Sequence, residues 1–160
     1  METKTTHDLN AVVVFISEKL EKISRKDLIP FVHFGLTSED INNTAYSLMT
    51  KGATKNIMVP AIKNVLKELK KLARRTKSLP MLSLTHGQPA TTTTLGKELA
   101  VFISRIEREL VLINEINLLA KFSGATGSYA AHKAAFPKAN WSVFAKKFIK
   151  RLGLGQSPIT

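Results

Sequence analysis

The chain has 160 residues, about one domain's worth, and its 24 Lys and Arg against 12 Asp and Glu give a formal net charge of +12. It contains no cysteine, which excludes a disulfide framework, thiol catalysis and thiolate metal sites. The N-terminus lacks a secretory signal pattern, and no apolar run approaches the roughly 18 residues that a membrane span needs. The sequence therefore predicts a soluble, cytoplasmic protein with no membrane partner.

The apolar spacing near the N-terminus predicts a first helix from Asp8 to about Ile23. Asp8 is the expected N-cap, because its side chain can accept a hydrogen bond from a free backbone N–H of the first turn. The run SRKDLIP then ends the helix, since proline does not continue it.

A long second helix is expected over residues 38–76. Thr37, followed three residues later by Asp40, resembles a capping box, with aspartate in place of the usual Glu or Gln. Pro60 lies inside this helix and cannot donate a backbone hydrogen bond. The sequence therefore predicts a kink or a short interruption near Met58.

The second helix also carries the densest basic patch of the chain. Its members recur at helical spacing and are Lys63, Lys67, Lys70, Lys71, Arg74 and Arg75. No aromatic residue is interleaved with them, so stacking on nucleic-acid bases is unsupported. We interpret the patch as a solvated helix face, with phosphate-backbone binding and a protein partner as alternatives.

The third helix is expected from Leu95 to about Ala120, where apolar residues recur every seven positions. The repeating residues are Leu99, Ile106, Ile113 and Ala120, with Phe102, Ile103, Leu110 and Ile116 beside them. After it, SGATGSYAAHKAAFP breaks the helical pattern, and WSVFAKKFIKRL predicts a short final helix.

The fold class predicted from these elements is all-α, a bundle of long helices. We expect residues 1–125 to form the helical-bundle segment, and residues 126–160 a glycine-containing loop and short helix. The two longest helices would reach on the order of 57 and 39 Å at 1.5 Å per residue, which is extreme for a compact monomer of this size. Their apolar faces should meet other helices, so the chain is expected to be a fragment of a larger protein or a subunit of an intertwined oligomer.

Three interruptions of the helical pattern carry polar groups, at residues 5–8, 36–40 and 85–90. We expect each to lie at a helix end, where free backbone N–H groups and hydroxyls favour carboxylates or phosphates. Histidines stand in two of them and can exchange a proton near neutral pH. The residues alone thus indicate an anion site with acid and base chemistry, against the alternative of structural turns.

Three runs, HFGLTSEDINNTAYSLM, SLTHGQPATTTTLGKELAVF and KFSGATGSYAAHKAAFP, together resemble adenylosuccinate lyase, of the fumarase and aspartase superfamily, over nearly the whole chain. The resemblance implies a part of that superfamily's central helical domain. It also implies cleavage of adenylosuccinate to AMP and fumarate by anti β-elimination, and the analogous cleavage of a succinylated aminoimidazole carboxamide ribotide in purine synthesis. Active sites would be shared between subunits of a homotetramer, without a cofactor.

By this resemblance His86 matches the general acid that protonates the departing nitrogen. Thr37 and Ser38 match residues that hold the succinyl part of the substrate, and His7 lies near the phosphate or the leaving amine. The full set of implied substrate-site residues is Thr6, His7, Asp8, Thr37, Ser38 and Thr85. Position 6 departs from the family, which commonly has asparagine there. Within the set, the resemblance therefore gives least support to a substrate contact by Thr6.

The family's general base is a serine in a loop of the form SSxMPxKxNP, and no such run occurs in this sequence. By itself the chain is therefore expected to be inactive or nearly so. A non-catalytic helical oligomerisation fragment and a basic nucleic-acid-binding module are the alternatives, although no nucleic-acid partner is expected. No two of the four histidines have a metal-binding spacing, and His33 and His132 are interpreted as structural or surface residues.

Overall fold

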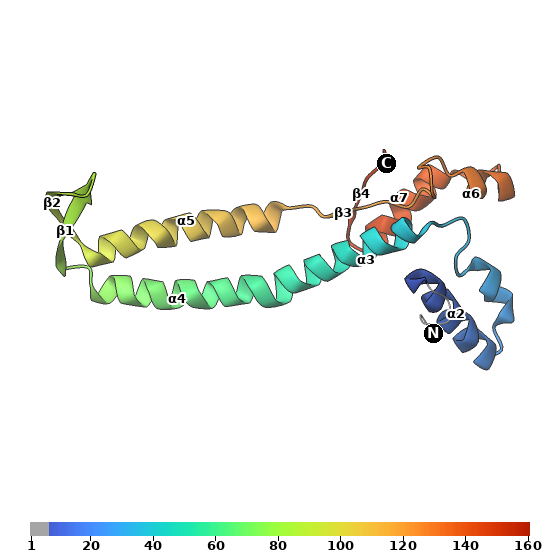
Figure 1. The fold of residues 1–160 in the computed structure, drawn as a ribbon, viewed down its shortest axis with the longest axis horizontal. Coiled ribbons are helices and arrows are strands. Elements are labelled where there is room, and N and C mark those ends of the chain that lie inside the picture. Colours follow the sequence, from blue (N-terminus) through green and yellow to red (C-terminus); the bar gives the residue numbers. More distant parts are fainter. Residues whose placement is uncertain (1–6) are drawn as a thin grey trace. The chain divides into compact units, whose positions relative to one another are not determined.

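The computed structural model describes residues 7–160, so Thr6 lies outside the described residues. The chain divides into two compact units, which we describe separately: the first combines Met1–Met49 with Leu118–Thr160, and the second is Thr50–Asn117. The predicted all-α fold is confirmed, since helices dominate the described residues and their strands form only a hairpin and a two-residue parallel pair (Figure 1). The expected domain boundary near residue 125 concerns the family's architecture and stays a prediction.

The second unit is a pair of antiparallel helices joined by a β-hairpin (Figure 1). Helix α4 (Val59–Arg75) and helix α5 (Leu95–Glu115) lie side by side, and β1 (Pro80–Thr85) and β2 (Gln88–Thr94) connect them. The core residues stand seven apart on each helix, as a seven-residue apolar repeat requires. They are Val59 and Leu66 on α4, and Ile103 and Leu110 on α5.

Gly96 permits the close approach of the chain where α5 begins. Its backbone N–H donates to the Thr76 carbonyl oxygen at 3.1 Å, and an added Cβ would lie 2.7 Å from the Lys77 Cα. Thr94 is the N-cap of α5 and its hydroxyl accepts from the Lys97 N–H at 3.2 Å. The hairpin therefore leads into α5 without a linker.

The interruption predicted near Met58 is confirmed. Helix α3 (Ser38–Ala53) passes into a π-helical stretch (Thr54–Met58), which passes directly into α4. Because Pro60 has no N–H to donate, a regular α-helical ladder cannot run through this point. A π-helical turn absorbs the mismatch while the chain stays helical.

The first unit begins with α2 (Asp8–Lys22), as predicted, followed by a 3₁₀ turn, η1 (Lys26–Phe31), that the sequence did not predict. The prediction that Asp8 is the N-cap was wrong. His7 is the capping residue, with extended backbone, and Asp8 is the first helical residue. The Asp8 carboxylate instead accepts from the next N–H, that of Leu9, at 2.7 Å.

The C-terminal segment of the first unit, residues 118–160, packs around the predicted final helix, α7 (Trp141–Arg151). Strand β3 (Leu119–Ala120) pairs in parallel with β4 (Gly155–Gln156), and the short helix α6 (Ala130–Ala135) lies between them in sequence. The core residues here are Ala120, Ile149 and Leu154. The expectation that α5 continues to about Ala120 was wrong, because Leu119 and Ala120 pair with β4 instead of extending the helix.

Large apolar side chains remain exposed on the second unit. Val65 on α4 and Phe102 on α5 are 56% and 57% exposed, and Leu84 on the hairpin is 67% exposed. Exposed apolar surface of this kind is expected where helices meet further helices. None of the described helices is both long and apolar enough to span a membrane.

Candidate active site

His86 lies at the turn of the hairpin in the second unit. Thr85, the last residue of β1, pairs with Gln88, the first residue of β2, so His86 and Gly87 form a two-residue loop. Both have positive φ, 50° for His86 and 72° for Gly87, as in a type I′ turn. Histidine tolerates this conformation better than most residues do, and a non-glycine residue held there is often functional.

The expectation that the THGQPA segment lies at a helix end was wrong. It spans the hairpin turn and part of β2, and α5 begins only at Leu95. The free amides of a helix N-terminus are thus not available beside His86 within this unit. The side chains of Thr85 and His86 are instead exposed at the tip of the hairpin, where they can face another surface.

Thr37 and Ser38 stand at the N-terminus of α3, as predicted. The Asp40 carboxylate accepts a hydrogen bond from the Thr37 N–H at 2.9 Å, which is one half of the predicted capping box. The Asp40 N–H donates in turn to the Thr37 carbonyl oxygen at 3.1 Å. Both residues are half-buried, so their hydroxyls sit in a fixed turn beside the first N–H groups of the helix.

Asp40 does more than cap its own helix. Its buried carboxylate also accepts from the backbone N–H groups of Ser123 and Gly124, each at 3.0 Å. The Lys121 ammonium lies 3.1 Å from the same carboxylate and donates to the Gly124 carbonyl oxygen at 2.9 Å. The sequence predicted the cap but missed these partners, since the loop that supplies them follows 83 residues later.

The charge of Asp40 is stabilised by these partners. Burial raises the pKa of the Asp40 carboxyl, but the hydrogen bonds from Thr37 and Ser123, with the nearby Lys121 charge, lower it by more. The pKa therefore lies below its ordinary value, and the group stays ionised near neutral pH.

His132 is fully buried in the first unit, which makes it a structural residue and not a surface one. Its ring is enclosed by aromatic rings, with centroids 4.8 Å away for Trp141, 5.4 Å for Phe122 and 5.7 Å for Phe34. Among the described residues, neither ring nitrogen has a hydrogen-bond partner. Burial lowers the pKa of His132, and the nearby charge of Asp40 opposes this only in part.

These two pKa shifts predict that acidification destabilises the first unit. The pKa of His132 is lower when folded than its ordinary 6.5, so the unfolded chain binds more protons below about pH 6.5 and stability falls there. Asp40 adds a second loss as the pH falls below its ordinary 3.8. Urea unfolding followed by the fluorescence of Trp141, the single tryptophan, measures both steps.

The matched variant is His132→Phe, which keeps an aromatic ring in an aromatic cage and removes the titrating group. We expect it to abolish the fall in the free energy of unfolding between about pH 7.5 and about pH 5.5 while leaving the step near pH 4. An equal fall in both proteins over the first interval would show that another group is responsible.

The N-terminal motif is described only in part. The His7 Nδ1 lies 3.1 Å from Asp8 Oδ1, and both side chains are largely exposed. Such a contact fixes the orientation of an imidazole ring, so Asp8 has the geometry to orient His7. Thr6, the remaining member, lies outside the described residues.

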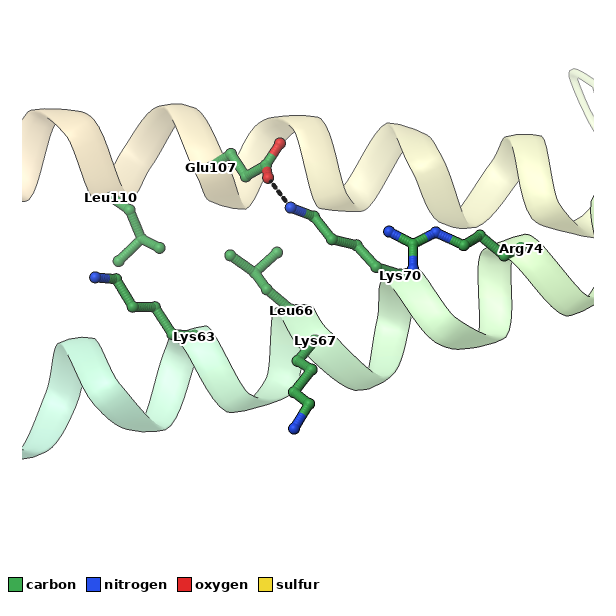
Figure 2. A pocket seen from close by; sticks show the side chains of 7 residues that line it. All are labelled: Lys63, Leu66, Lys67, Lys70, Arg74, Glu107 and Leu110. Atoms are coloured by element: carbon green, nitrogen blue, oxygen red, sulfur yellow. Dashed lines mark ion pairs between the residues drawn. The ribbon is translucent and has the colours of Figure 1, made fainter.

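Four of the six residues of the basic patch predicted on the second helix line a groove between α4 and α5 (Figure 2). Lys63, Lys67, Lys70 and Arg74 contribute the cations, and Lys70 forms an ion pair with Glu107. No aromatic residue lines the groove, so it offers no surface on which bases could stack. This agrees with the interpretation of a solvated helix face.

The predicted site residues fall into two sets. His7, Asp8, Thr37 and Ser38 belong to the first unit, and Thr85 and His86 belong to the second. Within the described part of the chain, no cluster of three or more acidic or histidine side chains could hold a metal ion. The first unit thus carries two hydroxyl side chains at a helix N-terminus, and the second carries an exposed histidine in a tight turn.

Comparison with known proteins identifies the family. The model of a lyase family matches residues 1–158. The chain belongs to this family. It is 44% identical over 163 residues to the adenylosuccinate lyase of Buchnera aphidicola from Acyrthosiphon pisum and 40% identical over 161 residues to that of Escherichia coli K12. Both alignments cover the whole chain but only 35% of the relative, so the chain spans about a third of these proteins.

The structural comparison agrees with this family. The β-carboxy-cis,cis-muconate cycloisomerase of Acinetobacter calcoaceticus matches 99% of the chain with a TM-score of 0.73 and 26% identity, over 39% of its own length. The helical architecture is thus shared with a family member whose name describes another reaction. The overall fold alone therefore does not select a substrate, and the choice depends on sequence identity and on the site residues.

Proposed function

We propose that this chain forms part of an adenylosuccinate lyase, which cleaves adenylosuccinate to AMP and fumarate and acts likewise on the succinylated aminoimidazole carboxamide ribotide. The observation that carries the proposal is the 40–44% identity, along the whole chain, to proteins of that name. The local geometry supports it, because a histidine at an exposed turn and a hydroxyl-bearing helix N-terminus are the groups that this elimination needs.

The reaction breaks one C–H and one C–N bond. A base takes the proton from the carbon beside a carboxylate, and an aci-carboxylate forms. Its electrons then make the carbon–carbon double bond of fumarate as the C–N electrons leave with nitrogen. His86 in its protonated form donates a proton to that nitrogen and becomes neutral imidazole. Thr85, the residue before His86, helps to hold the carboxylates of the succinyl group.

Thr37 and Ser38 supply the complementary function. Extra negative charge develops on the succinyl carboxylate during proton removal, and donors fixed in advance around that oxygen stabilise the transition state. The hydroxyls of Thr37 and Ser38 and the free N–H groups at the start of α3 are such donors. His7, oriented by Asp8, would meet the phosphate or the leaving amine.

The complete site requires further chain. The family's serine base lies in a loop of the form SSxMPxKxNP, which this sequence does not contain. The exposed apolar faces of α4, α5 and the hairpin fit a bundle with other subunits, in keeping with a cytoplasmic homotetramer whose active sites are shared. The chain alone is accordingly expected to be inactive.

A chimaera tests the proposed function directly. In the Escherichia coli relative, the 161-residue stretch aligned with this chain is replaced by the chain itself. Turnover of adenylosuccinate, followed as the release of fumarate, is the expected result, with the chain alone as the inactive control. A chimaera that folds and assembles but releases no fumarate would favour the alternative, a non-catalytic oligomerisation segment.

A further inference from the structure

We propose that Asp40 is a positioning residue of this active site: its carboxylate joins the Thr37–Ser38 turn to the 121–124 segment and thereby fixes the hydroxyls that hold the succinyl group. The inference rests on the proposed function. It goes beyond it because nothing in the chemistry of the elimination assigns a role to Asp40, whose side chain is fully buried.

Both oxygens of the Asp40 carboxylate are engaged. Oδ2 accepts from the Thr37 N–H at 2.9 Å and from the Gly124 N–H at 3.0 Å. Oδ1 accepts from the Ser123 N–H at 3.0 Å and lies 3.1 Å from the Lys121 ammonium. One side chain thus receives donors from two segments that are more than 80 residues apart in sequence.

The arrangement requires a carboxylate and not merely a side chain of this shape. Three backbone N–H groups and one ammonium converge on it, and an ionised carboxylate is the side chain that only accepts. An asparagine has the same shape, but its NH₂ group would face two of these donors. Those donors would be left buried without an acceptor, which costs more than the loss of a typical hydrogen bond.

The two joined segments are also in direct contact. A Cβ added to Gly124 would lie 3.3 Å from the Gly35 carbonyl oxygen, so the turn before Thr37 packs against the 123–124 backbone. The Lys121 N–H donates to the Asn43 side chain at 3.0 Å, and the Ser47 hydroxyl donates to the Leu119 carbonyl oxygen at 2.6 Å. Residues 119–124 therefore follow one side of α3, and Asp40 anchors this contact at the end that carries Thr37.

This anchoring acts on the reaction through position. The hydroxyls of Thr37 and Ser38 can stabilise the developing charge only if they are held in place before the substrate arrives. A displacement of about 1 Å at such a group can lower the rate by about 100-fold. Asp40 therefore affects turnover through the position of Thr37 and Ser38 and without touching substrate.

The test compares Asp40→Asn with Glu39→Gln in the chimaera described above. Glu39 is exposed on the same turn of α3, so its variant removes one negative charge without touching the anchor. We expect Asp40→Asn to lower kcat/KM for adenylosuccinate by about 10- to 100-fold per folded, assembled molecule, and Glu39→Gln to leave it unchanged. Lys121→Met, which keeps the three N–H donors, should give a smaller loss than Asp40→Asn.

Amide hydrogen exchange of the chain itself supplies the second readout. Asp40→Asn should speed exchange at Thr37, Ser123 and Gly124, and Glu39→Gln should not. Equal kcat/KM in Asp40→Asn and Glu39→Gln, or a loss in Asp40→Asn that only follows the amount of folded tetramer, would overturn the inference. An unsubstituted chimaera without activity contradicts the proposed function instead, and unchanged exchange at the three amides would then refute the anchor as well.

Discussion

Replacement of His86 by asparagine is expected to lower kcat of the chimaera for adenylosuccinate by about 100- to 10,000-fold, the range that a general acid contributes. Asparagine is the best test residue because Asn-Gly is the preferred pair for a type I′ turn, so the hairpin is retained. The variant removes the proton donor at a position whose φ of 50° asparagine adopts readily. A loss of activity would therefore report chemistry and not unfolding.

The matched control for this prediction is His33→Gln, which removes a half-buried histidine of unassigned role. Steady-state release of fumarate and the melting temperature are measured for both variants. Unchanged melting with a large fall in kcat only for His86→Asn is the expected pattern. Full turnover by His86→Asn would eliminate His86 as the general acid.

Replacement of Gly35 by alanine is expected to destabilise the first unit by roughly 2–4 kcal/mol, a large share of the stability of a small domain. Gly35 has a φ of +65°, which alanine resists. An added Cβ would also lie 2.7 Å from His132 Nε2 and 2.8 Å from two further ring atoms. The ring cannot retreat, because it is fully buried among Phe34, Phe122 and Trp141.

A double variant separates the two causes. In His132→Ala the ring that Gly35→Ala would strike is absent, so the added methyl group should cost only about 1 kcal/mol for its backbone conformation. Urea unfolding monitored at Trp141 gives the four free energies of the cycle. If Gly35→Ala lowers the free energy of unfolding equally with and without the His132 ring, the contact with the ring does not contribute to the destabilisation.

Much of the helical framework follows from the sequence alone. On the third helix the buried residues are Ile103 and Leu110, which the sequence placed beside the repeat, whereas the predicted repeat residues Ile106 and Ile113 are only partly buried against them. Pro60 marks the place where the second helix becomes π-helical, because its missing N–H and its ring act locally. These predictions depend on residues within a few positions of each other, which is where sequence patterns are informative.

The hairpin was missed although its signals are local. Glycine and proline end helices, which favours a helix end here, but His86 and Gly87 form a two-residue turn, and the threonines that follow favour a strand. The end of α5 at Glu115 was missed for another reason. Leu119 and Ala120 continue the apolar repeat, yet they pair with Gly155 and Gln156, a contact no local pattern contains.

The sequence names candidate site residues, but it does not show which buried residues hold them in place. Resemblance to the family selected Thr37, Ser38 and His86, and the structure gives each a local geometry suited to the role proposed for it. The anchoring of Thr37 by Asp40 to Ser123 and Gly124 could not be read from the sequence, because it depends on folding two distant segments together. The cage around His132 is non-local in the same way, since Phe34 and Trp141 meet there only after folding.

The proposed function implies that Thr37 and Ser38 of one subunit and His86 of another complete a single lyase site, and mixing two inactive chimaeras tests this most directly. One carries Thr37→Ala with Ser38→Ala, the other carries His86→Asn, and the two are refolded together in equal amounts. If the groups come from different subunits, about a quarter of the sites regain both, and about a quarter of the unsubstituted activity should return. A mixture no more active than its two components measured separately would contradict the account.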